Sequence, residues 1–148
     1  MFEYDVIIPV YRPDEKLNRL IDCLLTQTRM PQRIILINTD RDEFLKFSQE
    51  EPFLARDPRI ELHHIAKAQF DHGGTRNYGV SLSHAQFFVC MTDDAIPAGN
   101  TMMEELLKPF VSESIGVSYA RQLPDPDCGI IERYTRSFNY PEKERIKT

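Results

Sequence analysis

The stretch that decides the fold is Phe87-Phe88-Val89-Cys90-Met91-Thr92-Asp93-Asp94, an apolar run that ends in two carboxylates. The run predicts a buried strand. Ligands of open α/β sheets bind beyond the carboxyl ends of the strands, where these carboxylates stand. Carboxylates there suit Mg²⁺ or Mn²⁺, and such ions commonly arrive with the phosphates of a substrate. We therefore expect a phosphorylated, nucleotide-linked substrate. The alternative is a solvated turn or a cap for the next helix.

Strand and helix patterns alternate along the rest of the 148-residue chain. Apolar runs predict strands at 6–10, 34–37, 60–65, 87–91 and 115–120, and amphipathic or capped segments predict helices at 14–27, 43–50, 73–85 and 100–110. Continuously apolar strands are typical of burial on both faces. The alternation predicts an α/β fold of three layers, α/β/α, with a mainly parallel central sheet. Segment 130–138 is ambiguous.

Composition narrows the class of protein. A net charge of −5 without a basic run argues against nucleic-acid binding. The three cysteines form no CxxC pair, which argues against a zinc site or a disulfide framework, and we expect Cys23 and Cys90 to be small core residues. The N-terminus lacks the pattern of a signal peptide, and no apolar run has membrane-spanning length. These features favour a cytoplasmic protein.

Polar residues follow each predicted strand. Tyr11 follows the first, Asn38 ends the second, the segment 71–77 with Gly73-Gly74 follows the third, and Asp93-Asp94 follow the fourth. A parallel sheet brings these ends to one edge. The paired glycines would let backbone N–H groups approach an anion, or Asp71 caps the helix there. In nucleotide-binding α/β domains an amide such as that of Asn38 can bind a base or ribose, but Asn38 alone is more typical of strand termination. Tyr11 and Arg12 either pack on a base or form an exposed loop before the helix.

The two carboxylates should differ in role. Adjacent strand residues point to opposite sides, so one of the two contacts a metal directly. We favour Asp94 because it stands at the outer end. Asp93 then serves a ribose hydroxyl or a metal-bound water.

At this point the motifs resemble a known family. The residues 6–12 are similar to the opening strand of inverting family 2 glycosyltransferases of the GT-A fold, and Thr92-Asp93-Asp94-Ala95 falls where their metal-binding motif lies. The segments 70–77, 92–97, 121–124 and 136–141 together resemble the rhamnosyltransferase-type branch. The resemblance covers nearly the whole chain.

The resemblance implies transfer of a sugar, with rhamnose as a candidate, from a dTDP- or UDP-linked donor to a glycan or lipid-linked acceptor. It assigns Asp94 to Mg²⁺ or Mn²⁺. It assigns the nucleotide to Pro9, Val10, Tyr11, Asn38, Arg76, Thr92 and Asp93. Two motifs depart from the family pattern: Asn38-Thr39-Asp40 replaces the common acidic pair, and Thr92-Asp93-Asp94 replaces Asp-x-Asp.

The family's catalytic base is a carboxylate for which this chain has no counterpart, and we expect it beyond Thr148. Residues 1–148 are thus interpreted as a single nucleotide-sugar-binding domain, truncated before the acceptor region. The alternative is a non-catalytic nucleotide-sugar-binding or interaction module of the same fold. A nucleotidyltransferase or NAD enzyme is disfavoured because the glycines follow the third strand.

A truncated sheet leaves an open edge, which favours a homo-oligomer. The full-length protein is compatible with peripheral contact at the inner face of a membrane.

Overall fold

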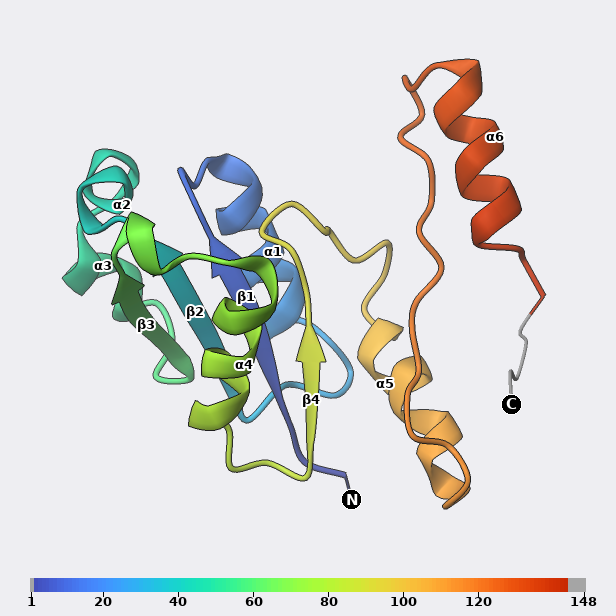
Figure 1. Ribbon diagram of the computed structural model, residues 1–148. Helices are drawn as coiled ribbons and strands as arrows, with labels where there is room; N and C mark the ends of the chain where they lie inside the picture. Colours follow the sequence, from blue (N-terminus) through green and yellow to red (C-terminus); the bar gives the residue numbers. More distant parts are fainter. Residues whose placement is uncertain (1, 144–148) are drawn as a thin grey trace. The chain divides into compact units, whose positions relative to one another are not determined.

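A computed structural model describes residues 2–143 of the chain. The residues form two compact units, one ending at Glu105 and the other beginning at Leu106, and each is described by itself. The predicted single domain over 1–148 therefore stays a prediction. Figure 1 shows the elements of both units.

The strands are β1 (Tyr4–Val10), β2 (Arg33–Thr39), β3 (Ile60–Ile65) and β4 (Phe87–Cys90). The α-helices are α1 (Glu15–Leu25), α2 (Arg41–Phe47), α3 (Glu50–Leu54), α4 (His72–Leu82), α5 (Met102–Leu107) and α6 (Ile130–Asn139). Two short 3₁₀ helices are η1 (Lys67–Gln69) and η2 (Lys108–Val111).

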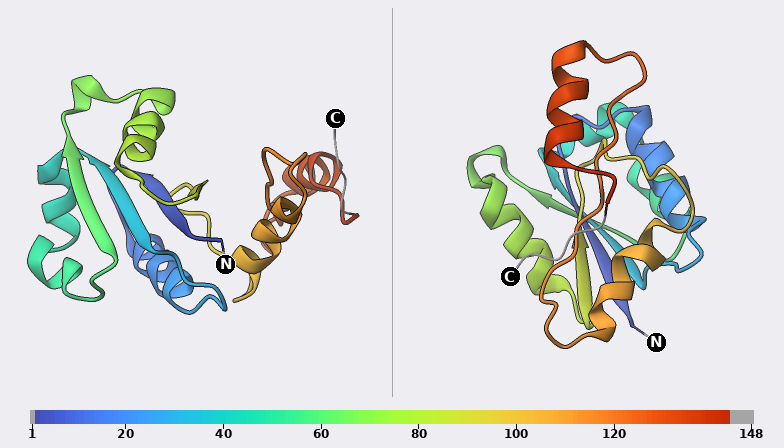
Figure 2. Two further views of the ribbon diagram at one scale, coloured as in Figure 1. Left: turned by 90° about the horizontal axis from the view of Figure 1, so that it is seen from below. Right: turned by 90° about the vertical axis from the view of Figure 1, so that its right-hand side faces the viewer.

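The sheet of the first unit has the order β3-β2-β1-β4, and each neighbouring pair is parallel. Helices α1 and α4 cover its opposite faces (Figure 2). The three-layer α/β/α prediction with a parallel sheet is therefore confirmed. Val10 pairs with Asn38, so β1 and β2 end at the same edge of the sheet. This edge, where all the strands have their carboxyl ends, is called the carboxyl rim below.

The core lies on both faces of β1 and β2. Most side chains in both strands are buried, as continuous apolar strands require when helices cover both sides. Helix α1 presents apolar residues at i, i+3, i+4 and i+7 to this core. They are Leu17, Leu20, Ile21 and Leu24, each 0% exposed. Asp14 caps α1 by accepting from the backbone N–H of Lys16 over 2.8 Å, as its type predicts.

The predicted strand at 115–120 is wrong. The segment has no regular secondary structure, and no strand of residues 2–143 pairs with it. An apolar run forms a strand only where a neighbour takes its backbone hydrogen bonds. Here Val117 and Tyr119 are 80% and 62% exposed. Cys90 is also exposed rather than in the core, because it ends a strand at the sheet edge, whereas Cys23 is half-buried.

The ambiguous segment 130–138 is helix α6 of the second unit, whose large apolar side chains are exposed. These side chains are Ile130, Ile131, Tyr134 and Phe138. The helix contacts the preceding extended segment through polar groups: Arg121 Nε donates to the Tyr140 carbonyl over 3.1 Å, and Arg136 donates to Gln122. Two of the segments that carry the rhamnosyltransferase resemblance therefore lie side by side within this unit.

Removing the carboxylate of Asp57 should lower stability in a pH-dependent way. Arg59 donates to Asp57 through Nε and Nη2, each over 2.8 Å, just before β3. These hydrogen bonds lower the pKa of Asp57 to about 2. A depressed carboxyl pKa stabilises the fold above the unfolded pKa near 4, and this stabilisation is lost as the pH falls toward 2.

We expect Asp57→Asn to cost about 1 kcal/mol at pH 7, because solvent screens the pair, and to cost progressively less below pH 4. Urea denaturation across this pH range measures the difference. Asp22→Asn is the control, because Asp22 pairs with Arg56 at a 68% exposed position and should change stability little. A cost for Asp57→Asn that is independent of pH would contradict the prediction.

Candidate functional site

Two residues at the carboxyl rim hold strained backbone conformations. Arg12, two residues after β1, has φ 50°, and Asp40, directly after β2, has φ 71°. Left-handed backbone is unfavourable for residues other than glycine, and it gathers at functional sites. Among residues 2–143 these are the two non-glycine positions with positive φ. Both follow neighbouring parallel strands, which draws attention to this edge of the sheet.

A cavity of about 220 Å³ opens at this rim, between the β1–α1 loop and the turn after β4. Its lining residues are Tyr11, Arg12, Asp14, Lys16, Leu17, Asp93 and Asp94. The two sides of the cavity meet because β1 and β4 are paired. The backbone N–H of Tyr11 points at Oδ2 of Asp93 at 3.5 Å, which orients this carboxylate toward the loop.

Asp93 and Asp94 stand in different surroundings. Asp93 is half-buried, and burial raises its pKa, while the backbone N–H of Tyr11 acts in the opposite direction. Asp94 is exposed, and its Oδ1 accepts a hydrogen bond from the Thr92 hydroxyl over 2.7 Å. Both lie in a turn, which the sequence left as an alternative, and this turn forms one wall of the cavity. The residue pair thus offers one shielded and one open carboxylate.

Hard oxygen ligands of this kind fit Mg²⁺ or Mn²⁺. Among the described residues no group of three or more His, Cys, Asp or Glu side chains is arranged to hold a metal. Two protein carboxylates with further ligands from a substrate diphosphate match the way Mg²⁺ is usually bound. The arrangement fits an ion that arrives with its ligand.

Cations surround the aromatic ring at the cavity. The guanidinium of Arg12 lies 5.1 Å from the ring centroid of Tyr11, and the ammonium of Lys67 lies 5.9 Å from it. Arg12 also pairs with Glu43 of α2 over 3.2 Å. Tyr11 is 37% exposed, so part of its ring is open. The site thus combines an aromatic surface, carboxylates and cations within one loop cluster.

The glycine pair serves the helix cap. Oδ1 of Asp71 accepts from the backbone N–H groups of Gly73 and Gly74, over 2.9 and 2.8 Å. Of the two alternatives that the sequence left open, the structure therefore shows the helix cap, because the carboxylate of Asp71 occupies the donors that an anion would use. Arg76 is one turn further along α4 and donates to the carbonyl of His72 over 2.8 Å. Although Cys90 as a whole is exposed, partial desolvation of its thiol at the end of β4 raises the thiol pKa, and the charge of Arg76 opposes this rise.

The remaining predicted nucleotide contacts lie inside the fold or beside the cavity. Val10 and Asn38 are 1% and 0% exposed, and Pro9 is half-buried in β1. Asn38 donates to the carbonyl of Asp40 over 2.9 Å. Of the predicted site residues, the structure brings Tyr11, Asp93 and Asp94 to the cavity, with Thr92 bonded to Asp94. The roles themselves stay predictions.

Sequence reasoning missed Asp14 and Lys16 as cavity residues. The sequence indicated Asp14 only as a helix cap and Lys16 only as an exposed position in the first turn of α1, whereas both line the cavity. Their place at the cavity depends on the approach of the β4 turn to the β1–α1 loop. Nothing in their local spacing signals that approach.

The model of Glycosyl transferase family 2 matches residues 5–148. The chain belongs to glycosyltransferase family 2.

Two curated relatives of this family 2 chain are O-antigen chain rhamnosyltransferases. RfbN of Salmonella typhimurium is 30% identical over 145 residues, which is 97% of this chain and 44% of RfbN. WbaN of Salmonella anatum is 27% identical over 150 residues, which is 100% of this chain and 46% of WbaN. The chain thus spans less than half the length of these relatives. The predicted resemblance to rhamnosyltransferases of this family is confirmed.

Solved structures show the same fold. TarS 1-349 of S. aureus has a TM-score of 0.56 at 16% identity, covering 74% of the family 2 chain and 31% of TarS. The TarS complex with UDP-GlcNAc also has a TM-score of 0.56, at 12% identity, covering 80% and 38% of the two chains. The predicted GT-A fold is confirmed. Of the helices within residues 2–143, none is both long and apolar enough to cross a membrane.

Proposed function

We propose that this chain is the donor-binding part of an inverting glycosyltransferase. It transfers a sugar, with rhamnose as the first candidate, from a dTDP- or UDP-linked donor to a glycan or lipid-linked acceptor. The observation that carries the proposal is the cavity that joins the Tyr11 ring to the Asp93–Asp94 turn. Family membership and the two rhamnosyltransferase relatives support the class of reaction. We place the protein in the cytoplasm, and this placement is compatible with peripheral contact of the full-length protein at the inner face of the membrane.

Charge at the cavity explains why the binding should need a metal. Asp14, Asp93 and Asp94 line it together with Arg12 and Lys16, so carboxylates outnumber cations. A diphosphate would be repelled by this excess of negative charge. In this proposal Asp94 holds Mg²⁺ or Mn²⁺, with Asp93 beside it. When bound, such an ion neutralises the diphosphate and polarises the leaving oxygen.

The other residues orient the donor. The open part of the Tyr11 ring suits stacking on a nucleobase, with Pro9 and Val10 fixing the strand that presents it. Asn38 Oδ1 is a buried acceptor without a partner among the described residues, which fits a donor N–H of a pyrimidine once the covering side chains move. Arg76 would approach the diphosphate from α4, and Thr92 would steady Asp94.

The proposal assigns no catalytic base within residues 1–148. The base is expected in the remaining part of a longer protein, and the chain alone is expected to be inactive in transfer. Binding of the donor is therefore the property to test on this chain.

Asp94→Asn should weaken metal-dependent nucleotide binding about tenfold or more, because one ionised ligand is lost, and tenfold corresponds to about 1.4 kcal/mol. Calorimetry with dTDP and UDP, with and without Mn²⁺, measures this. Asp127→Asn in the second unit is the control, because its exposed side chain lies outside the cavity lining. A folded chain that binds neither nucleotide in the presence of Mn²⁺ would contradict the proposal. Binding without any transfer by the full-length protein would favour the binding-module alternative.

A further inference from the structure

A chain of four polar side chains runs from the buried end of β2 to the protein surface. Asn38 Nδ2 lies 3.0 Å from His64 Nδ1, and His64 Nε2 lies 3.1 Å from Oε1 of Glu50. Glu50 accepts from Arg41 over 2.6 Å from Nε and 3.3 Å from Nη2. Asn38 is 0% exposed, whereas the His64 and Glu50 side chains are 22% and 23% exposed. The chain therefore connects a fully buried amide to a solvent-facing ion pair.

The partners of His64 define its protonation state. The amide nitrogen of Asn38 can only donate, so His64 Nδ1 must accept and carries no proton. The single proton of the neutral ring then resides on Nε2, where Glu50 accepts it. An imidazolium would direct a second N–H at the amide N–H of Asn38. The observed arrangement is therefore that of neutral His64.

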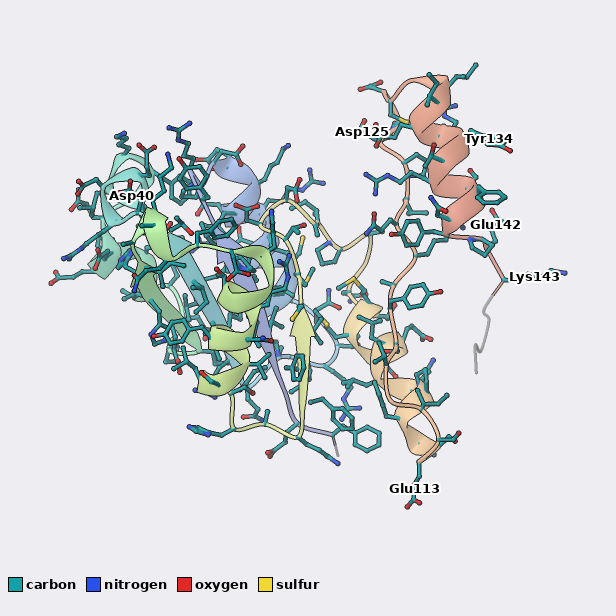
Figure 3. The ribbon with its side chains drawn as sticks, in the orientation of Figure 1. Asp40, Glu113, Asp125, Tyr134, Glu142 and Lys143 are labelled. Atoms are coloured by element: carbon teal, nitrogen blue, oxygen red, sulfur yellow. The ribbon has the colours of Figure 1, made fainter. Side chains whose placement is uncertain are left out.

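The same Asn38 amide holds the strained turn after β2. Nδ2 also donates to the Asp40 carbonyl over 2.9 Å, and Asp40 has φ 71°. Oδ1 of Asp40 accepts from the backbone N–H of Asp42 over 3.1 Å and thereby caps α2. Figure 3 shows Asp40 beside α2. Asn38 Oδ1, in contrast, is buried without a partner among the described residues, so the amide has an unused acceptor.

We propose that His64 is a positioning residue for the carboxyl rim and that its protonation releases this rim. A second ring proton turns Nδ1–H into a donor, and the Asn38 amide must rotate to present Oδ1 to it. The Asp40 carbonyl then loses its donor, and the left-handed turn and the start of α2 relax. Glu43 of α2 moves with them, and it is the ion-pair partner of Arg12 at the cavity. Nucleotide affinity therefore falls as His64 protonates, a step that rests on the proposed function.

The groups that face His64 set the balance between its two states. Glu50 of α3 favours the charged ring, and Asn38 of β2 favours the neutral one. The hydrogen bond from Arg41 lowers the pKa of Glu50, which keeps this partner ionised. Phe44 of α2 places an uncharged ring edge-on, with centroids 5.9 Å apart. The adjacent His63 contacts Glu61 instead and points to the other face of the sheet.

The first arm of the test uses no nucleotide. We expect the ¹⁵N–¹H resonances of the Asn38 side-chain amide to shift between pH 8 and 5 with the midpoint of the His64 ring signals. H64N should abolish this shift, because an asparagine oxygen accepts at the place of Nδ1 without titrating. H63N is the matched control and should leave the shift unchanged. An Asn38 amide that is insensitive to pH in the wild-type chain would overturn the inference.

The second arm measures dTDP and UDP binding with Mn²⁺ in the same chain. The quantity compared is the ratio of wild-type to H64N affinity at each pH. Ionisation of the nucleotide phosphates affects both affinities equally and therefore does not change this ratio. One pH unit below the midpoint about a tenth of the molecules remain neutral, so the wild-type chain should bind about tenfold more weakly than H64N. A ratio that does not change with pH would overturn the inference and leave the proposed function standing.

The two failures are distinguishable. If no nucleotide binds the wild-type chain at any pH, the proposed function fails, while the Asn38 resonances still decide whether His64 controls the amide. Glu50→Gln gives a second test that keeps the ring in place. Removing the carboxylate should move the midpoint of the Asn38 shift to lower pH, and an unchanged midpoint would contradict the described chain of contacts.

Discussion

Replacing Asp5 with alanine is expected to destabilise the chain by about 3 kcal/mol or more. Asp5 lies in β1 and is 1% exposed. Its Oδ2 accepts from Nη2 of Arg33 over 2.8 Å and from the Ser83 hydroxyl over 2.7 Å. The same guanidinium donates to the carbonyl of Leu82 over 2.8 Å. One buried carboxylate thus joins β1, β2 and the end of α4. Its removal leaves the Arg33 guanidinium, whose side chain is 24% exposed, with Glu61 of β3 as its remaining ion-pair partner at 3.3 Å.

Urea denaturation at pH 7 measures the loss, with Glu3→Ala as the control because Glu3 is exposed two residues earlier. A second variant separates the buried charge from the lost packing. Asp5→Leu combined with Arg33→Met removes both charges of this pair and should cost less than Asp5→Ala alone, since a half-buried cation that has lost one of its two carboxylates is more costly than an apolar replacement. A loss below about 1 kcal/mol for Asp5→Ala would show that water reaches Arg33 and screens it.

Asp5 also shows what the sequence could reveal. Continuous apolar runs predicted β1 and β2, and helical spacing predicted α1, because these signals are local. The pairing of Asp5 with Arg33 joins residues 28 positions apart, and nothing in either neighbourhood marks it. The strand expected at 115–120 failed for the same reason, since it needed a partner that local pattern does not supply.

Some features of the candidate site could be predicted from the sequence, and others could not. Parallel topology correctly placed the ends of β1 and β4 together, and so Tyr11 beside Asp93. The role of the glycine pair was ambiguous because a capping carboxylate and a bound anion use the same N–H groups. In the structure Asp71 takes them. Asn38 is buried at the end of β2 and hydrogen-bonds to His64, 26 residues away. Side-chain hydrogen bonds between strands therefore could not be predicted from the sequence.

Gly79→Ala is the second substitution with a large expected effect. Gly79 is buried in α4, on the side that packs against the sheet. A Cβ atom there would overlap Cγ2 of Ile7 and lie 3.4 Å from Cγ1 of Ile37. Alanine gains about 1 kcal/mol of helix propensity over glycine, but overpacking a filled core costs about 1–3 kcal/mol and sometimes more. We expect a net loss of about 2 kcal/mol, because the overlap is with a fully buried side chain.

Gly99→Ala is the matched control, because a Cβ at Gly99 meets no atom within 4 Å. The mechanism predicts a specific non-additivity in urea denaturation. Ile7→Ala removes the overlapping methyl, so the double variant with Gly79→Ala should be more stable than the sum of the two single losses predicts. Additive losses would show that α4 moves away from β1 instead. Because α4 also carries Arg76, such a movement would weaken nucleotide binding in Gly79→Ala, so calorimetry of the same variants distinguishes local repacking from displacement of the helix.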